Sequence, residues 1–336
     1  MDLSKLYIKK KFYQYYSKHT PILPKRLKNR EFAIVPIEFF PNFVMIRHLS
    51  FTSELELKKH ILAKIPSHIY YSSAYYQRPY EDDMEKKGWI GADLIFDIDS
   101  DHLPIKTRSM ERALELAKRE LKKLVTILRK DFGIREEDMR VFFSGGRGYH
   151  VHVFSDEYLK LSSIERREII DYITLNSPNL DYNSNVSRRL LSFTKRRLKR
   201  DEKLREKLRI NPEELDGKDV TRRLKRAIDL LKSEALIKLK IHIDAPVTAD
   251  IRRLIRLPGS LHGKTGLRVT EVEDIDSFDP LTESVVFGEE RARIKILKKV
   301  KFRLFDHKFC FAPNEIIEVP EYVAVFLICQ GLAKLG

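Results

Sequence analysis

Apolar residues along the chain follow two periods, one typical of helices and one typical of strands. Residues 112–132 carry apolar side chains at helical spacing and are followed by Gly133, which predicts an amphipathic helix with a glycine stop. Two more helices are predicted over residues 5–18 and 55–65. Short β-branched and aromatic runs predict strands at residues 31–36, 43–48, 67–76, 94–99, 140–143 and 151–154. This interleaving predicts an α/β (α+β) core with a mixed β-sheet.

The pattern changes between residues 156 and 239, where charged residues and leucines dominate and glycines are few. Basic runs lie at 195–200 and 222–226. Such runs on helices are usually solvated faces, and contact with nucleic acid is the alternative. The strand pattern returns at residues 241–243, 267–272 and 284–287. We therefore predict a core made of residues 1–155 and 240–336, with an inserted helical subdomain at 156–239.

One apolar strand carries two carboxylates. In the run Leu-Ile-Phe-Asp-Ile-Asp, residues 94–99, the side chains of Asp97 and Asp99 leave the same face, because strand side chains alternate with a period of two. Like charges on an apolar strand repel and are costly to desolvate, so a cation is expected between them. Two divalent metal ions roughly 3.5–4 Å apart would fit this spacing. The alternative is a strand end that runs into solvent, with Ser100 and Asp101 opening a loop.

Residues 144–150, Ser-Gly-Gly-Arg-Gly-Tyr-His, form a glycine-rich turn between two predicted strands. Glycines allow the backbone to approach a ligand closely, and their N–H groups can form an anion-binding nest. Ser144, Arg147 and His150 add a hydroxyl, a guanidinium and an imidazole, a set that suits a triphosphate. The alternative is a hairpin that needs glycine only for its backbone angles. A metal pair of His150 and His152 is also possible, but His152 better suits a role in the fold.

Residues 256–266, Arg-Leu-Pro-Gly-Ser-Leu-His-Gly-Lys-Thr-Gly, resemble a nucleotide-binding P-loop only in part. The end of the motif is present, but Pro258 stands where its first glycine is required, and the following residues are strand-like rather than helical. We therefore exclude a P-loop. Phosphate binding remains the prediction, because His262 and Lys264 stand between flanking glycines.

The composition adds a strongly basic charge and almost no cysteine. Lys and Arg outnumber Asp and Glu by 64 to 49, a formal net charge of +15. Such an excess favours a polyanionic partner, nucleic acid before membrane, because neutralised phosphates release counterions. Two cysteines, Cys310 and Cys329, exclude a disulfide framework. No stretch approaches the roughly 20 apolar residues of a membrane span, so we expect a cytoplasmic protein.

Three motifs, taken in order and with their approximate spacing, resemble the small catalytic subunit of the archaeal and eukaryotic DNA primase. They are Asp97-x-Asp99, residues 144–150 and residues 260–266. Residues 29–32 and 46–51 also resemble that family, so the similarity extends from about residue 5 to residue 290. The resemblance implies a primase catalytic core and template-dependent synthesis of short primers on single-stranded DNA. The reaction would be two-metal nucleotidyl transfer from NTP or dNTP.

The resemblance also implies a third metal-binding carboxylate, 18 residues before the histidine of the last motif. Counting back from His262 gives Asp244, which ends the apolar run at 241–243. Three other aspartates lie nearby as competitors: Asp250, Asp276 and Asp279. We prefer Asp244 for its spacing and its strand context. Asp97, Asp99 and Asp244 would then hold two Mg²⁺ or Mn²⁺ ions.

On the same basis, nucleotide binding is carried over to matching positions. These are Ser144, Arg147, His150, His262 and Lys264, with Arg30 as a further candidate. Family members commonly carry a zinc-binding segment rich in Cys and His soon after the aspartate pair. Residues 101–109 instead run into the predicted helix without a cysteine, so we expect no structural zinc.

The resemblance finally implies a heterodimer with a larger regulatory subunit. The apolar patches at residues 12–16 and 323–332 are candidate contacts for it. Two alternative functions remain open from the sequence. One is a primase-like nucleic-acid-binding subunit without activity, and the other is a metal-dependent glycosyltransferase with an Asp-x-Asp motif.

Overall fold

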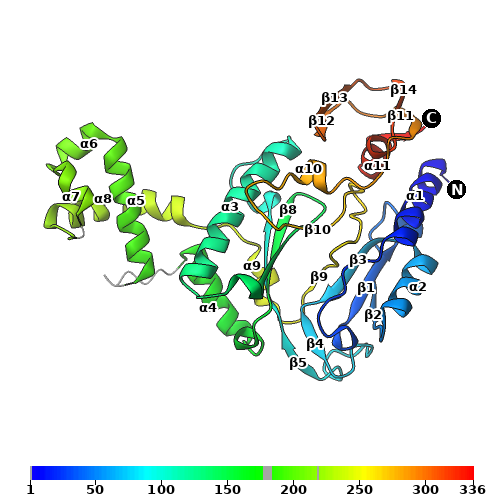
Figure 1. Cartoon of the computed structure of the whole chain (residues 1–336), viewed down its shortest axis with the longest axis horizontal. Coiled ribbons are helices and arrows are strands. Elements are labelled where there is room, and N and C mark those ends of the chain that lie inside the picture. The colour runs from blue at the N-terminus through cyan, green and yellow to red at the C-terminus, as the bar shows by residue number, and fades with distance from the viewer. Residues whose placement is uncertain (1, 177–183, 218) are drawn as a thin grey trace.

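Two neighbouring four-stranded sheets form the centre of the molecule (Figure 1). The computed structural model describes residues 2–176, 184–217 and 219–336. The first sheet has the order β2 (Ile46–Leu49), β1 (Phe32–Pro36), β3 (Pro66–Ser72) and β9 (Leu254–Arg256). The second has the order β10 (Thr270–Glu271), β7 (Met139–Phe143), β8 (Gly148–Val153) and β6 (Leu94–Asp99). The strand pairs described in both sheets are antiparallel, so the helices and sheets combine in the α+β form of the predicted class.

Three smaller sheets and a set of helices complete the described fold. The small sheets pair β4 (Ala74–Tyr76) with β5 (Trp89–Ala92), β12 (Val300–Leu304) with β13 (His307–Phe311), and β11 (Arg291–Ile296) with β14 (Ile316–Pro320) and β15 (Ala333–Leu335). The helices are α1 (Leu3–Lys18), α2 (Glu54–Lys64), α3 (Met110–Lys130), α4 (Ser163–Thr174), α5 (Asn185–Arg200), α6 (Glu202–Lys207), α7 (Pro212–Asp216), α8 (Arg222–Leu239), α9 (Ala245–Ala249), α10 (Pro280–Glu283) and α11 (Glu321–Cys329).

Helix α3 supports the second sheet. Its residues Leu114, Leu121 and Leu128 recur at helical spacing and are buried in the main core, where the helix contacts β6 and β8. Through the hydrophobic effect, burying each of these leucine side chains stabilises the folded state by about 1.5–3 kcal/mol. The helix follows Ser109, whose hydroxyl accepts a hydrogen bond from the N–H of Arg112 at 3.3 Å. The predicted helix is thus confirmed, with its start two residues earlier.

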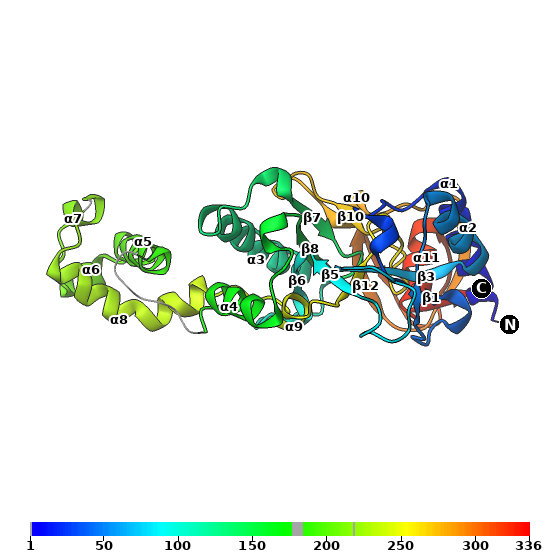
Figure 2. The same ribbon diagram turned by 90° about the horizontal axis from the view of Figure 1, so that it is seen from below.

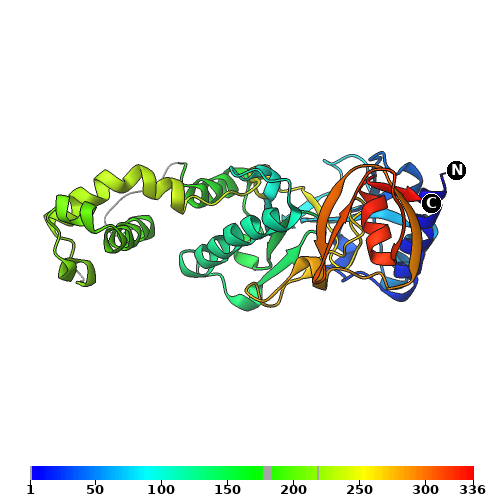
Figure 3. The same ribbon diagram turned by 90° about the horizontal axis from the view of Figure 1, so that it is seen from above.

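Helix α11 is buried along its whole length, between α1 and the C-terminal strands β11, β14 and β15 (Figure 3). This burial corrects one expectation. The patch at residues 323–332 was a candidate contact for a partner, but residues 323–329 belong to the core of this chain. In the patch at residues 12–16, Phe12, Tyr15 and Tyr16 are buried as well. Both apolar runs therefore stabilise the fold itself.

Two predicted strands take another form. Residues 241–243 belong to no described strand, and side chains of α3 bind the backbone of this segment instead. The Nζ of Lys123 donates to the carbonyl of Lys240 at 2.9 Å, and the N–H of His242 donates to the carboxylate of Glu120 at 2.9 Å. Residues 284–287 are likewise outside the described strands, and the predicted strand at 267–272 is reduced to β10.

Helices α5 to α8 project to one side of the sheets, away from the two termini (Figures 1 and 2). They pack mainly on one another, through a small cluster around Leu198 and Leu224 and another around Leu190 and Ala235. Helix α4 also lies within the predicted insertion, but its Ile173 is part of the main core. Residues 177–183 and 218 of the predicted insertion lie outside the described residues. None of the described helices is long and apolar enough to cross a membrane.

Candidate active site

The pairing of β6 with β8 positions the two carboxylates on the strand. Asp97 lies opposite His150, and Asp99 lies opposite Gly148. A side chain at position 148 would collide with the carbonyl oxygen of Ile98, so glycine is required for this close pairing. The Nε2 atom of His150 lies 3.6 Å from Oδ1 of Asp97. Both aspartates are half-buried, which places their charges at the border of the core.

Asp244 lies beside this pair. Its backbone N–H donates to the carbonyl oxygen of Asp97 at 2.8 Å, and helix α9, which begins at the next residue, contacts β6. Two of the competing aspartates are committed elsewhere. Asp276 forms an ion pair with Lys122, and Asp279 pairs with Arg303 at 2.8 Å. The structure therefore brings Asp244 to Asp97 through an extended segment rather than through the predicted strand.

The three carboxylates repel one another. Burial, together with the charges of Asp99 and Asp244, raises the pKa of Asp97 to about 7. The guanidinium groups of Arg256 and Arg253 act in the opposite direction and lower the same pKa. The net shift is upward, because burial and the two neighbouring carboxylates together outweigh the two arginines. A bound cation would relieve this repulsion.

The donor set fits a hard divalent cation, although the side chains are not gathered around one point. Across residues 2–176, 184–217 and 219–336, no group of three or more His, Cys, Asp or Glu side chains is arranged to hold a metal ion as it stands. One oxygen of Asp99 accepts the N–H of Asp101 at 2.9 Å, and one oxygen of Asp244 lies 3.9 Å from Nδ1 of His102. Carboxylate oxygens are the ligands that Mg²⁺ and Mn²⁺ prefer, and side-chain rotation would release the local contacts of these two.

The two predicted phosphate-binding segments pack against each other. The hydroxyl of Thr265 donates to the carbonyl of Gly145 at 2.6 Å, which joins the turn at 144–148 to the loop at 260–266. Gly145 has a φ of +74°, and a Cβ there would lie 2.7 Å from the Cβ of His262. Glycine is therefore required at this position by both its backbone angle and its contact.

The predicted nucleotide-binding side chains meet at this junction. Ser144 and His262 are buried, whereas Arg147 and Lys264 are exposed. Burial lowers the pKa of His262 well below its usual range, and the nearby charges of Arg147 and Lys264 are among the further causes. Burial also lowers the pKa of His150 to about 3. Both imidazoles are therefore neutral at pH 7 without a ligand, and the positive charge of the site comes from arginine and lysine.

Arg30 does not belong to the site, and the expectation that it binds nucleotide is wrong. Its side chain is 0% exposed, and its guanidinium donates to the carboxylate of Asp93 at 2.5 Å. The same group donates to the carbonyls of Ser72 and Ser73 and stacks on the ring of Tyr75. These bonds use its donors inside the core, where they satisfy a buried carboxylate.

Arg256 and His68 are the site residues that sequence reasoning missed. The guanidinium of Arg256 donates to Nδ1 of His68 at 2.7 Å and to the hydroxyl of Tyr70 at 2.9 Å, and its charge reaches Asp97. The ring of His68 lies 5.0 Å from that of His262. Arg256 begins the segment at 256–266, for which phosphate binding is predicted, and a cation there is the signal that could have found it. The sequence around His68 carries no such signal, because it has the pattern of an ordinary buried strand.

Three carboxylates beside two joined glycine-rich loops suit metal-assisted nucleotidyl transfer. The chain belongs to the DNA primase small subunit family, whose sequence profile matches residues 96–274. The chain is 55% identical to the DNA primase small subunit PriS of Archaeoglobus fulgidus, over 99% of each chain. It is 40% identical to PriS of Thermoplasma volcanium, over 96% of this chain and 95% of the relative. The resemblance drawn from the three motifs is thereby confirmed.

A solved structure of the polymerase domain from Mycobacterium tuberculosis Ligase D in complex with DNA is also similar. Its TM-score is 0.41 at 13% identity, and the match covers 81% of this chain and 83% of that one.

The repulsion at Asp97 predicts a stabilising substitution. The folded-state pKa is near 7 and the ordinary value is 3.8, so the carboxyl destabilises the fold progressively as pH rises from about 4 to 7 and fully above 7. Asp97→Asn should therefore raise the melting temperature of the metal-free protein by a few degrees at pH 8, and by less at pH 5. Circular dichroism melts in EDTA measure this, and a lower melting temperature at pH 8 would contradict it. Excess Mg²⁺ or Mn²⁺ should stabilise the wild type more than the variant.

Proposed function

We propose that this chain starts primers on single-stranded DNA, by template-directed nucleotidyl transfer from NTP or dNTP. The supporting observation is the position of Asp97, Asp99 and Asp244 beside the joined loops at 144–148 and 260–266. Family membership supports the same activity. The substrate would lie across this junction, with the reacting atoms at the carboxylates and the triphosphate at the loops.

Asp97, Asp99 and Asp244 would hold two Mg²⁺ or Mn²⁺ ions. Such ions, when bound, activate the primer 3′-hydroxyl and neutralise the charge that develops on the triphosphate and the departing pyrophosphate. The strand β6 fixes two of the carboxylates, and the backbone hydrogen bond from Asp244 to Asp97 fixes the third. A strand and a backbone bond hold ligands more rigidly than a flexible loop would.

The triphosphate would be bound by Ser144, Arg147, His150, His262 and Lys264 together with Arg256. Arg147 now pairs with the exposed carboxylate of Asp101 at 2.9 Å, a weak surface contact that a triphosphate can replace. Arg256 is held by His68 and Tyr70, so its charge is already positioned. The exposed Arg147 and Lys264 and the half-buried Arg256 would thus supply the positive charge that meets the anionic substrate.

We propose a larger regulatory primase subunit as the partner, with single-stranded DNA and nucleotide as substrates, inside the cell at the replication fork. We also propose the division into a catalytic core, residues 1–155 and 240–336, and an inserted helical subdomain, residues 156–239. The separate packing of α5 to α8 supports this division for residues 184–239, whereas α4 packs on the core. Structural zinc is not part of the proposal.

Metal-dependent incorporation of labelled NTP or dNTP on a homopolymer template tests the proposed function. Template-dependent product is the expected result. A chain that binds template but forms no product with either metal would be a binding subunit without activity, and the proposal would fail.

The position of Asp244 predicts which aspartates are needed. Asp97→Asn and Asp244→Asn should each abolish synthesis, because each removes a charged metal ligand while keeping the side-chain shape. Asp279→Asn is the matched control, since Asp279 pairs with Arg303 away from the site, and most activity should remain. Activity of Asp244→Asn within a few-fold of wild type at saturating Mn²⁺ would remove Asp244 from the metal site.

The loop at 260–266 predicts a separation of nucleotide binding from DNA binding. Lys264→Ala and His262→Ala should raise the KM for nucleotide by roughly ten- to a hundredfold, which corresponds to about 1.5–3 kcal/mol for removing a charge-assisted hydrogen bond. Template affinity should change much less. Lys308→Ala, an exposed lysine on β13, is the control. If template affinity fell and the KM held, these residues would belong to the template groove instead.

A further inference from the structure

The positive charge of the chain is concentrated in helices α5 to α8. Residues 184–239 hold eighteen Lys and Arg against nine Asp and Glu, so 56 residues carry +9 of the net +15. Helix α5 alone contains seven Lys and Arg and no acidic residue. Close packing of like charge on one helix costs free energy, and it is tolerated where a polyanion compensates it.

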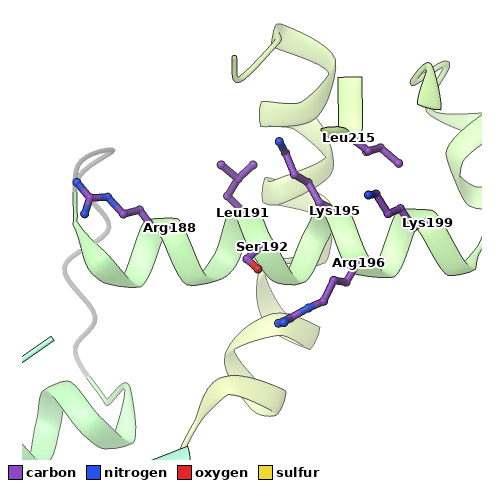
Figure 4. Close-up of a pocket in the computed structure, with 7 residues that line it drawn as sticks. All are labelled: Arg188, Leu191, Ser192, Lys195, Arg196, Lys199 and Leu215. Atoms are coloured by element: carbon purple, nitrogen blue, oxygen red, sulfur yellow. The ribbon is translucent and has the colours of Figure 1, made fainter. Parts of the chain in front are cut away.

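Four of these cations line one pocket beside α5, and we call them the α5 stripe: Arg188, Lys195, Arg196 and Lys199. An α-helix turns about 100° per residue, so Arg188, Lys195 and Lys199 lie within about 40° of one line along it. The stripe is about 16 Å long at a rise of 1.5 Å per residue. The pocket that they line has a volume of about 260 Å³ and also includes Leu191 and Leu215. In Figure 4, Leu191 and Lys195 point to one side of α5, while Arg196 points to the other side.

Most of the charge of the stripe is not compensated by carboxylates of the described residues, although Lys195 and Lys199 also bond to the C-terminal end of α7. Within the described residues, Lys199 alone among the four forms an ion pair, with Asp216 at 2.5 Å, and both side chains are exposed. Lys195 and Arg188 donate to neutral oxygens, of Gly217 and Asn185. Arg197, on another face of α5, is by contrast paired with Asp201 at 2.8 Å. Arg197 is thus neutralised by a carboxylate, whereas Arg188, Lys195 and Arg196 of the stripe form no ion pair among the described residues.

We propose that the α5 stripe binds the phosphodiester backbone of the single-stranded DNA template, away from the active site. This inference rests on the proposed function, which supplies a template longer than the site itself. A row of cations matches a row of phosphates, and binding gains free energy from the counterions released. The apolar floor of Leu191 and Leu215 suits the exposed face of a base, which a duplex hides. Figures 1 and 3 place α5 at the end of the molecule opposite the termini, where template emerging from the core would be held.

The test compares two variants of the full chain that lose the same charge. One carries Arg188→Gln, Lys195→Gln, Arg196→Gln and Lys199→Gln, which keep helix propensity. The control carries Lys298→Gln, Lys299→Gln, Lys301→Gln and Lys308→Gln, at exposed positions on and before the β12–β13 hairpin. Binding of fluorescent oligo(dT) is measured by anisotropy in EDTA across a salt series, after melts confirm folding.

The stripe variant should bind roughly tenfold more weakly at 0.1 M salt. The slope of log K against log salt should become shallower by about 0.7 for each phosphate that the variant no longer neutralises. The control should stay within about twofold of wild type. An equal loss of affinity in both variants, or no loss in the stripe variant, overturns the proposal. An equal or larger loss on duplex DNA also overturns it, because the inference commits to single strands.

Synthesis separates this proposal from the proposed function. Asp97→Asn should lose synthesis and keep oligo(dT) affinity, so a failure of catalysis leaves the binding test intact. On a series of homopolymer templates, the stripe variant should match wild type on the shortest and fall behind on the longest. Equal synthesis at every length, with unchanged binding, would overturn the α5 stripe as a template contact and leave the active site unaffected.

Discussion

The repulsion among three carboxylates is the constraint on which this structure depends. Asp97 and Asp99 leave one face of β6, and Asp244 is tied to the same strand by a backbone hydrogen bond. Their mutual charge and burial raise the pKa of Asp97 to about 7. The fold keeps them together because β8, α3 and α9 pack around the strand. The arrangement costs stability, as is typical of functional sites.

The second half of the site depends on contact between loops that are distant in sequence. Thr265 binds the carbonyl of Gly145, and His262 packs on the same turn, so the glycines at 144–148 are constrained by tertiary contact as well as by their own geometry. Arg256 then adds a charge from β9, on the neighbouring sheet. The site therefore forms only when both sheets are in place.

The helical insertion follows a different physical rule. Its helices bury small clusters of leucine and alanine and expose a dense positive charge on α5. The core instead buries its charges in pairs, such as Arg30 with Asp93. A buried charge needs a specific partner within the protein, whereas water stabilises an exposed charge until a ligand binds it. This difference separates the part of the chain built for chemistry from the part that carries most of the net charge.

The local sequence pattern was sufficient to predict those elements and motifs whose signal lies within a few residues. The strand at 94–99, the helix beginning near residue 110 and the glycine turn at 144–148 follow from periodicity and glycine placement, and the family follows from the motifs. Only the tertiary structure decided which distant partner each polar group meets. In the folded chain, Arg30 pairs with Asp93, and the backbone of His242 binds Glu120 instead of a strand. Arg256 and His68 lie together at the site. The reason is physical: propensity acts along the chain, while the partner of a buried charge is set by whatever side chain folding brings beside it.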